Sequence, residues 1–156
     1  MTADIRLCDH GKFEPAFEIV KRQKIGMELQ LFADPLLKNV KKHIAYQKEQ
    51  TKNIKRLSLH APFWDLNLGS ALPSLRKETM KWFNYAYKIA KELNCDSIVV
   101  HDGYVPFTSK FTSGIPNWVK RATTFWQEFF ADKDDSITMM IENMLGLDSS
   151  VMIQEI

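Results

Sequence analysis

The fold is decided by the stretch Ile98-Val-Val-His101, a short apolar run that ends in a histidine. Four comparable runs lie elsewhere in the chain, at residues 5–8, 27–32, 57–60 and 137–142. Each has the length of a buried β-strand, and each is followed by a segment with apolar residues at helical spacing. Strands that alternate with helices are typical of a parallel sheet with helical crossovers.

The segments between the strands predict where the helices begin and which side they bury. The dipeptide Asp34-Pro35 combines a helix-capping residue with a proline, so we predict a helix that begins at Pro35. Another helix is expected to begin after Asp148. Two long helical stripes are expected to face the core: Leu75, Thr79, Phe83, Ala86, Ala90 and Leu93 in one, and Trp118, Ala122, Phe125, Trp126 and Phe129 in the other.

The spacing of the strands allows two architectures. Strand starts lie about 33 residues apart, so eight such units would occupy about 270 residues, the size of a (β/α)8 TIM barrel. An open doubly wound sheet of five strands is the alternative, and a chain of 156 residues suits it. The positions of the polar residues favour the barrel. We therefore predict an α/β fold of TIM-barrel type in a single domain over residues 1–156, with about five of the eight βα units present as a partial barrel.

Composition excludes several classes of protein. Hydrophobic residues make up 45% of the chain and charged residues 26%, which is ordinary for a globular domain. The formal net charge of +2 is too small for a dedicated nucleic-acid binder. No apolar run approaches the roughly 18 residues of a membrane helix, and the N-terminus does not resemble a signal peptide. The two cysteines, Cys8 and Cys95, are expected to be buried thiols, so we predict a cytoplasmic protein without a membrane partner.

Alternation along the strands places ionisable groups on one face of the sheet. In the strand at 57–60, Leu57 and Leu59 point to one side while Ser58 and His60 point to the other. The same alternation puts Glu28, His101 and Glu142 on the side of His60, opposite apolar neighbours. One face is therefore expected to lie under helices, and the mixed face is expected to line a barrel interior.

Three of these groups occupy the last position of their strands: His60, His101 and Glu142. Catalytic groups of α/β folds gather at the C-terminal ends of parallel strands. Two imidazoles and one carboxylate from neighbouring strands are suitable ligands for a divalent metal, zinc or manganese among them. The sequence thus predicts a metal site with these three ligands.

Three motifs resemble a known superfamily. They are Leu57-Ser-Leu-His-Ala-Pro-Phe-Trp-Asp-Leu-Asn-Leu-Gly-Ser70, Ile98-Val-Val-His-Asp-Gly103 and Met140-Ile-Glu-Asn143. In order and spacing they are similar to the third, fourth and fifth strand motifs of the xylose isomerase-like TIM barrels. That superfamily includes sugar and sugar-phosphate isomerases and epimerases, and the endonuclease IV type of apurinic-site nuclease.

The resemblance implies roles for particular residues. It makes Glu142 a metal ligand and catalytic residue, with His60 and His101 as metal ligands or substrate contacts. The metal would be Zn, Mn or Mg. Members also take ligands from the sixth to eighth strands, so this chain would hold half a site. We therefore expect a barrel truncated after the fifth βα unit and inactive as it stands, or a short form that pairs with a second copy.

Three functions remain open from the sequence. The first is a metal-dependent sugar or sugar-phosphate isomerase or epimerase, in which Glu28 and Trp64 also contact the small-molecule substrate. The second is an endonuclease IV-like nuclease, which would bind nucleic acid. The third is a non-catalytic partial barrel that associates into a homo-oligomer through its open sheet edges.

Overall fold

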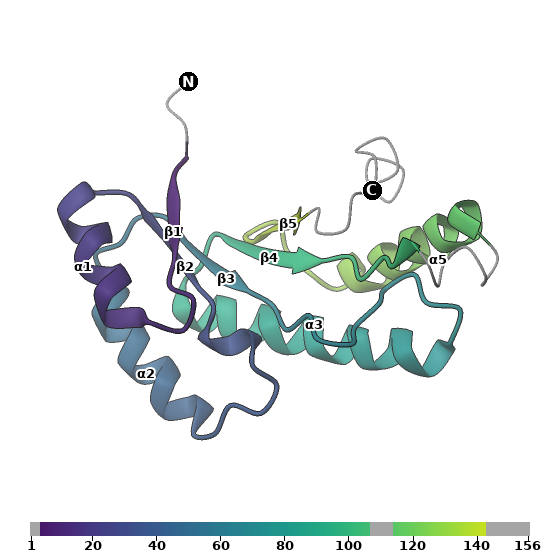
Figure 1. Cartoon of the computed structure of the whole chain (residues 1–156), viewed down its shortest axis with the longest axis horizontal. Helices are drawn as coiled ribbons and strands as arrows, with labels where there is room; N and C mark the ends of the chain where they lie inside the picture. Colours follow the sequence, from purple (N-terminus) through teal and green to yellow (C-terminus); the bar gives the residue numbers. More distant parts are fainter. Residues whose placement is uncertain (1–3, 107–113, 143–156) are drawn as a thin grey trace.

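The computed structural model describes residues 4–106 and 114–142, which form one parallel sheet with helices on one side. The strands lie side by side in the order in which they occur in the chain (Figure 1). A doubly wound sheet reverses its strand order part-way across, so this order excludes that architecture and confirms the partial barrel. The strands are β1 (Arg6–Cys8), β2 (Gly26–Leu29), β3 (Leu57–His60), β4 (Ser97–His101) and β5 (Thr138–Glu142).

The helices supply the core that covers the outer face of the sheet. Figure 1 shows α3 running beneath β3 and β4. Phe83 of α3 is fully buried, and its ring contacts those of Phe125, Trp126 and Phe129 at centroid distances of 5.5 to 6.3 Å. Both predicted stripes face the core, except that Leu75 is only partly buried. The elements are α1 (Phe13–Gln23), a short 3-10 helix η1 (Leu31–Ala33), α2 (Val40–Thr51), α3 (Pro73–Leu93) and α5 (Gly114–Phe130).

The prediction that a helix begins at Pro35 is wrong, because α2 begins at Val40. The carboxylate of Asp34 accepts a hydrogen bond from the amide of Leu36 at 2.8 Å, which closes an Asx turn. The chain then passes through Asn39 in the left-handed conformation, at φ 56°, before α2 starts. Aspartate followed by proline is typical of turns as well as of helix starts, and here the turn forms. The helix expected after Asp148 lies outside the described residues.

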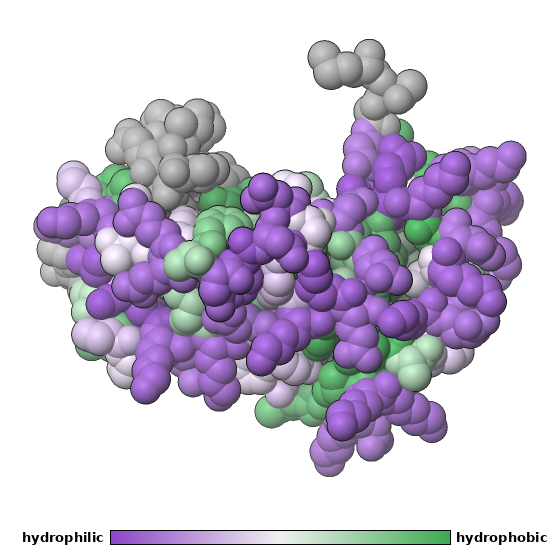
Figure 2. Space-filling view, turned by 180° about the vertical axis from the view of Figure 1, so that it is seen from behind, coloured by the Kyte–Doolittle hydropathy of each residue, from purple (hydrophilic) through white to green (hydrophobic). Residues whose placement is uncertain are grey.

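The predicted alternation along the strands is confirmed. Met27, Leu29 and Leu59 are fully buried in the core that they share with the helices. Their neighbours Glu28 and His60 line a hollow on the opposite face. The space-filling view from behind shows a largely hydrophilic surface with a smaller hydrophobic area (Figure 2). Among the described helices, none is long and apolar enough to cross a membrane.

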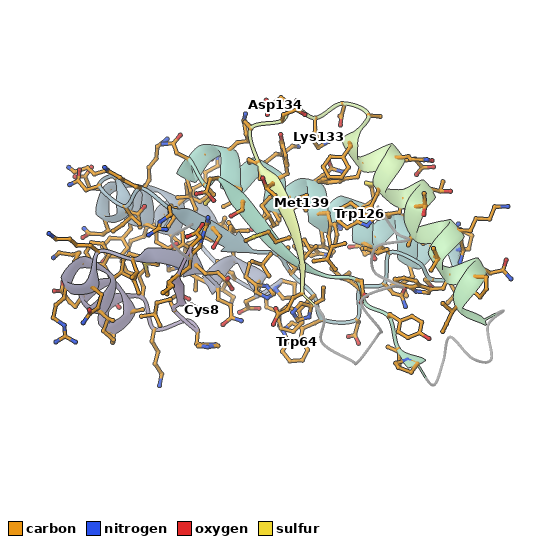
Figure 3. All side chains as sticks on the ribbon, turned by 90° about the horizontal axis from the view of Figure 1, so that it is seen from above. Cys8, Trp64, Trp126, Lys133, Asp134 and Met139 are labelled. Atoms are coloured by element: carbon orange, nitrogen blue, oxygen red, sulfur yellow. The ribbon has the colours of Figure 1, made fainter. Side chains whose placement is uncertain are left out.

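The turn from α5 to β5 is fastened to α3 through Asp134. Its carboxylate accepts hydrogen bonds from Lys91 at 2.9 Å, from Tyr87 at 3.2 Å and from the Ser136 amide at 3.0 Å. The Ser136 hydroxyl also donates to it, and these donors hold the pKa of Asp134 well below its usual range. Figure 3 shows Asp134 at this turn, while Met139 and Trp126 lie beside each other further along β5 and α5. The turn thus sets the position of β5, which carries Glu142.

We expect Asp134→Asn to unfold at a lower temperature than the wild type at pH 7. A carboxyl with a lowered pKa in the folded state stabilises the fold above its unfolded pKa of about 3.9, and that contribution is lost as the pH falls through the folded pKa. The difference in Tm should therefore narrow as the pH falls below about 4. Thermal unfolding by circular dichroism measures it, and Asp135→Asn is the control with the same change in charge. Equal effects of both substitutions would contradict the assignment.

A candidate metal centre at the strand ends

The three predicted ligands meet where β3, β4 and β5 end. The register places His101 directly beside Glu142, whereas His60 pairs with Val99, two residues before His101. This stagger between strands is what a barrel requires. Strand order, register and alternation together bring the three side chains to one point.

One carboxylate oxygen is shared by two imidazoles. Glu142 Oε2 lies 3.1 Å from His101 Nε2 and 3.4 Å from His60 Nε2. The ring centroids of the two histidines are 5.0 Å apart, with the planes at 81°. One donor atom from each residue lies within 4.8 Å of the other two, so the three side chains are close enough together to hold one cation.

The tautomer of His60 suits a metal ligand. Its Nδ1 lies 2.8 Å from the carbonyl oxygen of Ala61, and a carbonyl can only accept, so Nδ1 carries the hydrogen. In the neutral ring Nε2 then presents a lone pair to the Glu142 carboxylate. Two electron-rich atoms at 3.4 Å need a cation or a proton between them. A backbone carbonyl that fixes the tautomer of a histidine is also the usual support behind a metal ligand, so these residues fit a metal.

The surroundings of His101 favour the neutral imidazole, which is the form that can bind a cation. Burial lowers the pKa of His101, and the neighbouring His60 lowers it further, while the hydrogen bond to Glu142 opposes both effects. A lowered pKa keeps the imidazole neutral at pH 7, and only the neutral ring can ligate a metal. His60 is only 3% exposed, so most of its side chain is screened from bulk water.

The three predicted ligands lie in an open hollow of about 640 Å³ on the inner face of the sheet. Glu28, a predicted substrate contact, lines this hollow from β2. No lysine or arginine is among the lining residues that the structure describes. The lining comprises Cys8, His10, Glu28, Gln30, His60, Phe63, Val99, His101, Met140, Ile141 and Glu142.

Trp64, the other predicted substrate contact, lies at the rim. Its side chain is 65% exposed and lies outside the residues that line the hollow. It packs on Phe63 at a centroid distance of 4.7 Å, and Phe63 in turn lies 4.4 Å from His101. Phe63 is thus the wall of the hollow, and Trp64 backs it from the solvent side.

Cys8 was expected to be a buried thiol, yet it is half-buried and lines the hollow. Burial and the nearby Glu28 raise the pKa of its thiol to about 11, so it is uncharged at pH 7. The alternation that placed Glu28 would have placed Cys8 as well, because the two residues are register partners on β1 and β2. Cys8 therefore adds a neutral group to the wall.

The loop after β3, residues 61–72, is fixed by α5. Trp118 Nε1 donates to the side chain of Asn67 at 3.0 Å, and Arg121 Nε donates to the carbonyl of Gly69 at 2.8 Å. A Cβ on Gly69 would lie 2.4 Å from the Trp118 ring, so only glycine fits there. Since this loop carries Phe63 and Trp64, α5 helps to position the wall of the hollow.

The tight turn at Gly103, after His101, brings two loops into close contact. Gly103 adopts the left-handed conformation, at φ 69°. A Cβ there would lie 2.1 Å from the carbonyl oxygen of Leu66. The close neighbour of Gly103 is therefore the loop after β3, which the glycine allows to pack tightly.

Comparison with known proteins supports the same fold. No family model matches the chain. A solved structure of a D-tagatose 3-epimerase-like protein superposes with a TM-score of 0.72 at 19% identity, over 99% of this chain and 60% of that one. The order of strands and helices is thus shared along the chain. The chain has the fold of a partial TIM barrel.

Other matches agree with this fold. A protein of Anabaena variabilis with a suggested sugar phosphate isomerase/epimerase function gives a TM-score of 0.57 at 12% identity, over 99% of this chain and 60% of that one. A Thermus thermophilus protein, from a crystal soaked with zinc chloride, gives 0.54 at 20% identity, over 90% and 66%. An uncharacterised protein of Methanocaldococcus jannaschii is 38% identical over 66 residues, which are 42% of this chain and 22% of that protein. The chain thus spans about 60% of the length of the epimerase-like structure.

We expect His60→Ala and His101→Ala each to weaken zinc binding by at least about 100-fold, because each would remove one of the three predicted ligands. Competition with a chromophoric chelator measures the affinity. His43→Ala is the matched control, since His43 lies on α2 away from the hollow. Zinc affinity that is unchanged in both site variants would exclude these histidines as ligands.

Proposed function

We propose that this domain is the metal-binding part of a sugar isomerase or epimerase. The observation that supports the proposal best is the convergence of both imidazoles on one oxygen of Glu142, inside a hollow lined by neutral and acidic groups. The chain covers about 60% of the epimerase-like structure, so the activity of the whole protein is part of the proposal. A cytoplasmic location and self-association stay predictions from the sequence.

His60, His101 and Glu142 would hold the metal. Two nitrogen donors with one carboxylate favour zinc over magnesium, which prefers oxygen donors, and manganese is the next choice. When bound, the divalent ion would polarise the carbonyl and adjacent hydroxyl of an open-chain sugar and so stabilise an enediolate. The histidines would keep these ligand positions through the Ala61 carbonyl and the packing of Phe63.

Proton transfer needs a base, and the hollow offers two carboxylates. Glu142 lies at the metal position and Glu28 lies on the wall formed by β2. A carboxylate would take the proton from the hydroxyl-bearing carbon beside the carbonyl. Return of a proton to the opposite face of that carbon gives an epimer. Return to the carbonyl carbon, with transfer of the hydroxyl proton to the former carbonyl oxygen, gives an isomer. The thiol of Cys8 beside Glu28 is uncharged, and no lysine or arginine is among the described residues of the lining.

The lining favours a neutral sugar over a phosphorylated one. Phosphate groups are normally bound by arginine, lysine or backbone amides, and the described part of the hollow contains neither cationic side chain. Phe63 offers aromatic surface next to the imidazoles, which suits a sugar ring, and Trp64 packs on Phe63. The same lack of cations counts against an endonuclease IV-like role, since binding to DNA depends on lysine and arginine contacts to phosphates.

Incubation of the whole protein with ketoses in D2O and zinc or manganese tests the proposal, because this chain covers about 60% of the epimerase-like structure. We expect deuterium to enter the carbon beside the carbonyl, because the abstracted proton exchanges with solvent. NMR spectroscopy detects the label and any epimer.

Glu142→Gln should lower the exchange rate at least about 100-fold, and Glu28→Gln should lower it as well, because a general base contributes about 10²- to 10⁴-fold. Glu92→Gln, exposed near the end of α3, is the control. Metal-dependent cleavage of an abasic-site duplex without sugar exchange would instead support the nuclease.

A further inference from the structure

A second polar cavity lies on the outside of the molecule, between α3 and α5. It has a volume of about 430 Å³ and is separate from the hollow that holds the candidate metal centre. Its walls are the N-terminal half of α3 and the middle of α5. The lining residues are Pro73, Arg76, Lys77, Met80, Lys120, Arg121, Thr124, Phe125 and Glu128.

Four cationic side chains face this groove. Arg76 and Lys77 come from α3, and Lys120 and Arg121 come from α5. Among the described lining residues Glu128 is the single acid, and it lies two helical turns beyond Arg121. The groove therefore concentrates positive charge on two facing helices, although the formal net charge of the whole chain is only +2.

Both guanidinium groups are held in place. Arg76 Nη1 donates to the carbonyl of Ser70 at 2.7 Å, and Arg121 Nε donates to the carbonyl of Gly69 at 2.8 Å. Burial lowers the pKa of Arg121, and the charge of Arg76 lowers it further, so the two groups repel each other. Two fixed guanidiniums that repel each other are suited to an anion that lies between them.

The helix dipole does not account for Arg76 and Lys77. Both lie near the N-terminus of α3, where the dipole disfavours positive charge, and the first turn contains no acidic residue. An anionic ligand in the groove would offset this charge.

We propose that the α3–α5 groove binds a small molecule that carries two or more linked phosphate groups. Arginine matches phosphate oxygens with paired N–H donors, and lysine adds point charges at the mouth. The volume lies within the range of small-molecule sites, and Pro73, Met80 and Phe125 offer apolar contacts for an organic part. A polynucleotide would need a longer basic stripe than this groove provides. The site does not depend on the proposed sugar chemistry.

Titration calorimetry with inorganic triphosphate, on the metal-free protein, tests this proposal. We expect binding that weakens at least about 10-fold when Lys77→Gln and Lys120→Gln are combined, because two of four cations are removed. These two lysines are exposed, whereas Arg76 and Arg121 also support the loop after β3. Lys41→Gln combined with Lys48→Gln, exposed on α2, is the control with the same loss of charge.

Other results would overturn the proposal. They are an absence of triphosphate binding at millimolar concentration, or an equal loss of affinity in the control pair. Tighter binding of a 12-base-pair duplex through the same lysines would overturn the small-molecule class. Loss of triphosphate binding in His60→Ala with His101→Ala would place the anion at the metal centre. Retained binding in that variant supports a separate site, whatever the outcome of the sugar assays.

Discussion

The structure depends on crossovers that all run in the same direction across a parallel sheet. Under this constraint the described helices pack on one face, as the shared core of Met27, Leu29 and Leu59 shows. The other face is left for polar side chains, and every second residue of a strand must point there. Strand ends then meet along one edge, which is why three chemically reactive groups can arise from three distant segments. The candidate site is thus a direct product of the winding of the chain.

Local pattern was sufficient to predict much of this arrangement. Alternation with a period of two assigned His60, His101 and Glu142 to one face, and their place at the strand ends brought them together. The choice between a barrel and a doubly wound sheet could not be made from spacing alone, since both share the same local units. That choice depends on which strands pair, and pairing is a long-range property.

Loops were the part that the sequence predicted least well. Asp34 and Pro35 are compatible with a helix start and with a turn, and only contacts formed in the folded chain select the turn. The exposure of Trp64 and the tight packing at Gly103 likewise depend on neighbours distant in sequence. The grouping of Arg76 with Lys120 cannot be predicted from the sequence pattern, because it requires α3 and α5 to lie next to each other. The local sequence pattern does not say how two helices, or a helix and a loop, pack against each other.

The loop after β3 links two regions that would otherwise be independent. Trp118 and Arg121 of α5 donate hydrogen bonds to Asn67 and Gly69 of this loop. Arg76 of α3 donates a hydrogen bond to its Ser70 carbonyl. Segments joined in this way open together, with a shared free energy of local unfolding. The amides of the loop should therefore exchange with solvent at the same slow rate as those of α5, although loops ordinarily exchange fast. The wall beside the candidate metal centre would then unfold locally as rarely as the helix behind it.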